Sequence, residues 1–89
     1  MPEHEKIKVI EAALAIGFSL SEAIQRALGR SLTAFASAHG FRQNEVSMCL
    51  AAYEGRVYPQ IRDAICSDLE IPREYLDRLI ADEARRRVA

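Results

Sequence analysis

The sequence predicts an all-α fold made of a single domain over residues 1–89. Apolar residues recur at three- and four-residue steps along most of the chain, and no segment alternates apolar and polar residues as a half-buried strand does. Ser, Gly and Pro separate these periodic segments, at places where such residues cap or stop helices. With 49% hydrophobic and 28% charged residues, the chain can bury one modest core while keeping a polar surface.

The first predicted helix runs from about Glu3 to Ile16 and stops at Gly17, so residues 1–17 form an N-terminal helical extension. A second helix follows, with Ser19 or Ser21 as its cap and Gly29 as its stop. The apolar positions that should face inward are Ile7, Ile10, Ala13 and Leu14 in the first helix and Ala23, Ile24, Ala27 and Leu28 in the second.

Residues 32–51, LTAFASAHGFRQNEVSMCLA, have the spacing of a helix-turn-helix motif. Ala36 is the fifth residue, where two helices that cross steeply leave room only for a small side chain. Gly40 is the ninth, where the bend commonly adopts the left-handed conformation that penalises a Cβ. We expect Ser31 to cap the first helix and the second to run from Gln43 to about Tyr53, ending near Gly55. The residues expected in the core are Phe35, Phe41, Val46 and Cys49.

Two further helices are predicted after the loop GRVYP, which carries Arg56 and Tyr58. Pro59 fits the first turn of one helix and Pro72 opens the last, because proline is tolerated where no backbone N–H is needed. The predicted buried residues are Ile61, Ala64, Ile65, Cys66 and Leu69 in the former and Tyr75, Leu76, Leu79 and Ile80 in the latter.

From Leu20 to Ile80 this order of parts resembles the Xre-type, lambda-repressor-like regulators and the short phage Ner-type regulators. The residues that carry the resemblance are AIQRALG, LTAFASAHGFRQNEVS and PQIRDAICSDLEIPREYLDRLI. The resemblance implies a five-helix core, here with an additional N-terminal helix, that acts as a homodimer on an inverted-repeat operator. The extension over residues 1–17 could then be a dimer interface, a site for a protein partner, or an enlargement of the core.

The motif predicts which side chains contact double-stranded DNA. Those left outside at the second helix, which the resemblance assigns to base reading, are Arg42, Gln43, Asn44, Ser47 and Met48. Gln and Asn can each bond an adenine edge, Arg can bind guanine, and Met can contact a thymine methyl group. The residues expected to contact phosphates are Arg30, Arg56 and Arg62. Capping or a solvated polar surface is the simpler alternative for these positions.

The net charge of −1 does not favour DNA binding, but the charge is unevenly distributed along the chain. Residues 26–62 contain five arginines and two glutamates, a net +3, whereas residues 63–83 contain seven acidic residues and two arginines, a net −5. Two residues depart from the family pattern. His39 replaces the usual aliphatic residue and is either a half-exposed or hydrogen-bonded core histidine, or a pH-sensitive or partner-contacting one. Glu45 lies early in the second motif helix, where its charge would approach phosphates.

Other classes of protein are less well supported. Cys49 and Cys66 lack partners at metal-ligand spacing and are expected to be buried free thiols, so neither a metal nor a cofactor is predicted. His4 and His39 are far apart without an evident nucleophile, and no glycine-rich phosphate loop occurs, which argues against an enzyme. Neither a membrane span nor a signal peptide is recognisable, so a cytoplasmic location is expected.

The expected function is a small sequence-specific transcriptional regulator, most simply a repressor. The alternative is a helix-turn-helix module that binds another regulator rather than DNA, as an antiactivator does. The pI of about 6.1, Glu45 and the N-terminal helix favour this alternative.

Overall fold

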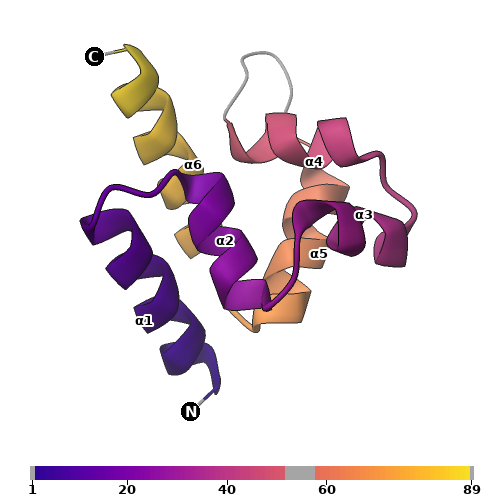
Figure 1. Ribbon diagram of the computed structural model, residues 1–89, viewed down its shortest axis with the longest axis horizontal. Coiled ribbons are helices and arrows are strands. Elements are labelled where there is room, and N and C mark those ends of the chain that lie inside the picture. Colours follow the sequence, from indigo (N-terminus) through magenta and orange to yellow (C-terminus); the bar gives the residue numbers. More distant parts are fainter. Residues whose placement is uncertain (1, 52–57, 89) are drawn as a thin grey trace.

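The computed structural model describes residues 2–51 and 58–88, and within these ranges every regular element is an α-helix (Figure 1). The helices are α1 (Pro2–Ala15), α2 (Leu20–Leu28), α3 (Leu32–His39), α4 (Gln43–Leu50), α5 (Pro59–Leu69) and α6 (Arg73–Val88). The all-α prediction is therefore confirmed. None of the helices in the described ranges has the length and apolar character needed to cross a membrane.

Serine side chains fix where α2 and α3 begin. Of the two predicted alternatives for α2, Ser19 is the cap, and its Oγ accepts the Glu22 N–H at 3.3 Å. Ser31 caps α3 in the same way, with its Oγ 3.1 Å from the Ala34 nitrogen. Each serine satisfies one of the amide groups that a helix start leaves without an intrahelical partner. The start of α3 was therefore predicted from local sequence, and that of α2 to within two alternatives.

Helix α2 is the central element of the fold and contacts α1, α4, α5 and α6. Its residues Leu20, Ala23 and Ile24 are completely buried, because they are covered from several sides. Figure 1 shows α1 on one side of α2 and the α3–α4 pair on the other. This arrangement gives the α3–α4 pair a surface that α1 does not cover.

Helix α1 enlarges the core, one of the three roles that the sequence left open for residues 1–17. Ile10 and Ala13 are buried, and the Lys6 Nζ donates a hydrogen bond of 2.9 Å to the Ala27 carbonyl near the end of α2. Val9 on α1 and Ile16 in the turn after α1 are nevertheless exposed large apolar residues.

Helices α5 and α6, in the C-terminal part of the chain, complete the hydrophobic core. Helix α5 begins at Pro59 as predicted, whereas α6 begins at Arg73, one residue after Pro72, whose carbonyl accepts the Leu76 N–H. Cys49 and Cys66 are buried free thiols, as expected. Helix α4 ends at Leu50, with Ala51 as its C-cap, short of the predicted end at about Tyr53. The predicted stop near Gly55 lies outside the described residues. The buried residues of these two helices and their connection are Ile61, Ile65, Cys66, Leu69, Ile71, Leu76 and Ile80.

Candidate nucleic-acid interface

Helices α3 and α4 are joined by a short turn that begins at Gly40. Gly40 has a φ of 75°, in the left-handed region predicted for it, and the Phe41 N–H bonds the Ala36 carbonyl at 2.9 Å. Ala36 is 2% exposed, in agreement with the need for a small side chain where the helices approach. The core beneath the turn contains Phe35, Val46, Cys49 and Leu50, all buried, while Phe41 is half-buried against it. Side-chain packing therefore fixes the direction of α4.

Three of the predicted DNA-contacting residues lie together and exposed at the start of α4. They are Arg42, Gln43 and Asn44. Arg42 occupies the N-cap position but makes no side-chain capping bond, so none of the three side chains is used to cap the helix. Within the described residues these side chains have no hydrogen-bond partner. They can therefore bind an external group without breaking an internal bond.

The other two residues assigned to base reading are less accessible. Ser47 and Met48 are half-buried, and the Tyr58 hydroxyl lies 4.0 Å from the Met48 sulfur as its hydrogen-bond donor. Glu45, in the first turn of α4, is also half-buried. Of the residues predicted to contact DNA at α4, only Arg42, Gln43 and Asn44 are therefore fully exposed.

Arg30 and His39 converge on one carboxylate, Asp68 near the end of α5. The Arg30 guanidinium is 3.0 Å and the His39 Nε2 is 2.9 Å from the same Asp68 oxygen. The side chain of Arg30 is 40% exposed, so it can still reach a phosphate at its free edge. His39 also stacks with Phe41, at 5.8 Å between ring centroids. His39 is therefore partly exposed and hydrogen-bonded to Asp68.

Arg62 is turned into the molecule rather than toward solvent. Its side chain is 14% exposed, and its guanidinium donates a bond of 2.8 Å to Asp77 of α6. Partial burial alone would raise the pKa of Asp77, but hydrogen bonds from Arg62 and Arg73, together with their charges, outweigh it and leave that pKa lowered. This geometry does not favour the predicted phosphate contact of Arg62, which would require breaking a charge-assisted bond.

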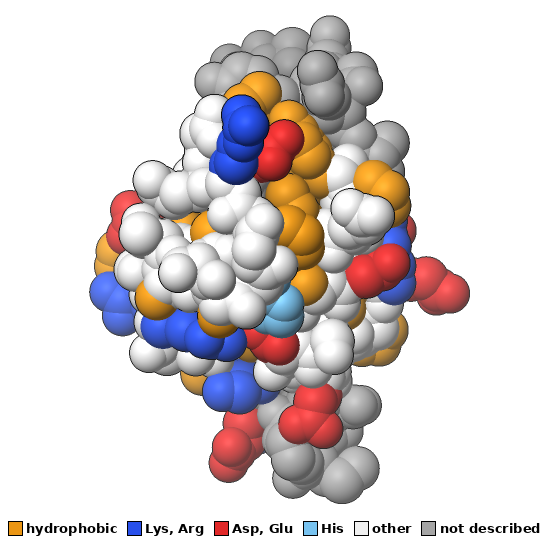
Figure 2. Space-filling view, turned by 90° about the vertical axis from the view of Figure 1, so that its right-hand side faces the viewer, with side chains coloured by type: hydrophobic (Ala, Val, Ile, Leu, Met, Phe, Trp, Pro, Cys, Tyr) orange, Lys and Arg blue, Asp and Glu red, His pale blue; other side chains and the backbone are white. Residues whose placement is uncertain are grey.

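The charge separation along the sequence is not kept in space. Arg30 and Arg62 come from the basic stretch, and each is paired with a carboxylate of the acidic stretch. Figure 2 views the molecule from the right-hand side of Figure 1 and shows small basic and acidic groups scattered over a largely uncharged surface. Pairing of this kind could not be foreseen, because the partners are 38 and 15 residues apart in the chain.

The predicted contact of Arg56 lies outside the described residues. In the ranges 2–51 and 58–88, no group of three or more His, Cys, Asp or Glu side chains is arranged to hold a metal ion. Comparisons with models of protein families, with curated proteins and with solved structures found no match.

Proposed function

We propose that this protein is a sequence-specific DNA-binding regulator of transcription that uses α3 and α4 as a helix-turn-helix unit. The observation that carries the proposal is the exposed, unbonded group Arg42, Gln43 and Asn44 at the first turn of a helix held by a packed core. Helices of this type place their N-terminal residues against base edges in the major groove. Gln43 and Asn44 suit adenine and Arg42 suits guanine or a phosphate.

The geometry of a dimer follows from the same proposal. Two half-sites one DNA turn apart require the two copies of α4 to lie about 34 Å from each other. Helix α1 lies on the opposite side of α2 from α4 (Figure 1), so a contact on the outer face of α1 would leave α4 uncovered. The outer face of α1, which carries the exposed Val9, could therefore serve a second copy or a protein partner.

The decisive experiment is selection from fragmented genomic DNA by the purified protein, followed by sequencing of the retained fragments. The test variant is Gln43→Ala/Asn44→Ala. Its matched control is Glu5→Ala/Lys8→Ala, which also removes two exposed side chains from a helix and leaves the net charge unchanged. We expect enrichment of one inverted repeat by the wild type and the control, and none by the test variant. No enrichment by folded wild-type protein would refute the proposal.

Gln43→Ala alone separates sequence reading from general affinity. On the selected site it should cost about 1–3 kcal/mol, because alanine cannot make the bidentate bond to a base, and on random DNA it should cost little. Equal effects on both would show that Gln43 does not read sequence. Binding should also weaken with salt between about 50 and 200 mM, because each phosphate contact releases counterions.

One observation favours a second candidate function, a module that binds and restrains another regulator. Two arginines expected to face DNA, Arg30 and Arg62, already hold carboxylates, which lowers the positive charge offered to phosphates. Retention on heparin separates the two candidates. A DNA-binding protein should be retained and eluted by salt, whereas a protein-binding module with this composition should flow through.

A further inference from the structure

One carboxylate of α5 holds the two donors that stand at opposite ends of α3. Arg30 directly precedes Ser31, the cap of α3, and His39 is the last residue of that helix. The Arg30 Nη2 lies 3.0 Å and the His39 Nε2 lies 2.9 Å from the Asp68 Oδ2. Helix α3 packs chiefly against α4, so these two bonds give it a polar connection to α5.

This cluster lies beside the first turn of α4. The rings of His39 and Phe41 stack, with 5.8 Å between their centroids and an angle of 13° between their planes. Phe41 immediately precedes Arg42, the first of the exposed residues that we assign to DNA contact. The major groove is about 12 Å wide, so a duplex bound at the start of α4 would bring the phosphates that border the groove near this cluster.

Asp68 occupies a position where the local electrostatics of a helix disfavour an acidic residue. It lies in the last turn of α5, which ends at Leu69, near carbonyl groups that carry the negative end of the helix dipole. His39 has the opposite and favourable placement at the end of α3. Helix formation by α5 therefore does not explain this aspartate. Departures from local rules of this kind are expected where a residue serves function.

The Asp68 carboxylate cancels the charge that Arg30 would otherwise offer to DNA. The Arg30 side chain is 40% exposed and that of Asp68 is 23% exposed, so a phosphate that approached the guanidinium would meet the carboxylate as well. Charges at a partly buried site are screened less than charges in free solution, and the carboxylate repels the phosphate. Arg30 in its paired state thus adds little to the attraction between this protein and DNA.

We propose that Asp68 is an attenuating residue, one that lowers the affinity for DNA by withholding Arg30 from the phosphate backbone. The inference rests on the proposed function, in which DNA is the partner of α3 and α4. An exposed ion pair contributes little to stability, so removal of the Asp68 charge should leave the fold intact and make Arg30 available. Attenuation keeps the sequence-independent part of DNA binding low, because phosphate contacts supply that part.

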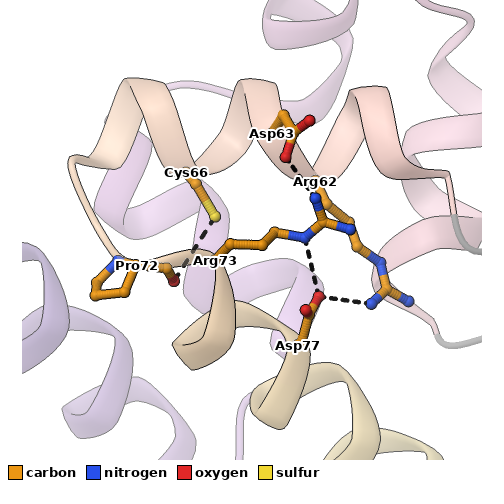
Figure 3. Close-up of polar contacts among 6 residues, drawn as sticks. All are labelled: Arg62, Asp63, Cys66, Pro72, Arg73 and Asp77. Atoms are coloured by element: carbon orange, nitrogen blue, oxygen red, sulfur yellow. Dashed lines mark hydrogen bonds and ion pairs between the residues drawn. The ribbon is translucent and has the colours of Figure 1, made fainter.

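The first test compares binding of random duplex DNA by Asp68→Asn and by a matched control, Asp63→Asn. Both variants remove one negative charge from α5, but Asp63 pairs with Arg73 in a network that joins α5 to α6 (Figure 3). Asp68→Asn should raise the affinity about fivefold to tenfold at 0.1 M salt and steepen the slope of log affinity against log salt by about 0.9, the contribution of one further phosphate. Asp63→Asn should leave the slope unchanged. An unchanged slope for Asp68→Asn would overturn the proposal.

The second test asks whether the gain depends on Arg30. Arg30→Gln removes the charge and keeps most of the length of the side chain, which lies over the buried ring of Phe35. In the wild type this substitution should change binding little, and in the Asp68→Asn background it should cancel the gain. If Arg30→Gln lowers the slope in the wild type by about 0.9, Arg30 already neutralises a phosphate and the proposal is wrong. A gain that persists in Arg30→Gln/Asp68→Asn would refute it as well.

A third measurement needs no DNA. The order parameter of the Arg30 Nε–H bond, from ¹⁵N NMR relaxation, should fall in Asp68→Ala and stay the same in Asp63→Ala. Equal values in wild type and Asp68→Ala would show that Asp68 does not hold Arg30. The outcomes also separate the two proposals. If neither the wild type nor Asp68→Asn binds DNA, the proposed function fails, whereas wild-type binding that Asp68→Asn leaves unchanged refutes only the role of Asp68.

Discussion

Replacing Gly40 by Ala should destabilise the protein by about 1 kcal/mol, entirely through backbone strain. Gly40 lies at a φ of 75° and a ψ of 22°, and a Cβ built on it meets no atom within 4 Å. No steric clash is therefore added. Holding an L-residue in the left-handed region costs about 1–2 kcal/mol, and restricting the unfolded chain returns about 0.4–1 kcal/mol, which leaves about 1 kcal/mol.

Gly29 supplies a matched control for this reasoning. It ends α2 at a φ of 74°, and a Cβ there also meets no atom within 4 Å. Gly29→Ala should therefore cost the same as Gly40→Ala, although the two glycines lie in different turns. Asn at either position should cost less than Ala, because Asn tolerates this conformation better.

Unfolding by urea and by heat, followed by far-UV circular dichroism, measures both variants, and each should lower Tm by about 4–8 °C in a domain of this size. A cost for Gly40→Ala that exceeds that of Gly29→Ala by more than about 2 kcal/mol would refute the reasoning, because the two backbones are alike. If neither Gly40→Ala nor Gly29→Ala lowered the free energy of unfolding, the reasoning would also be refuted, since the strain would then be absent.

Three other outcomes are expected from urea unfolding. Ser31→Ala should cost about 1 kcal/mol, since the Ala34 N–H is left without its capping partner, and an unchanged midpoint would contradict that role. Phe35→Ala should cost about 3–5 kcal/mol, because Phe35 is completely buried; a cost under about 1 kcal/mol would show that its site collapses. The lowered pKa of Asp77 means that its contribution is present above the unfolded pKa of about 3.9 and is lost as pH falls through the lower folded value. The difference in stability between wild type and Asp77→Asn should therefore be constant near neutrality and shrink below about pH 4; a constant difference into that range would contradict the ion pairs.

The start of the candidate interface was predictable because it depends on local chemistry. Ser31 and Gly40 act on amide groups and backbone angles within a few residues of themselves, so their roles can be read from the chain. The exposure of Arg42, Gln43 and Asn44 follows from helical periodicity once the buried face of α4 is known.

The order of residues alone dictates the all-α class, the helix starts marked by Ser31 and Pro59, and the apolar faces that build the core, because these depend on neighbours in the chain. For the start of α2 it left two serines open, and the structure selects Ser19. Which arginine side chains remain unpaired at the surface depends instead on how the helices pack. Asp68 and Asp77 reach Arg30 and Arg62 only after α5 and α6 have packed, so the segment that is basic in sequence gives a surface of mixed charge. Ion pairing between distant residues depends on helix orientation, and no local pattern encodes it.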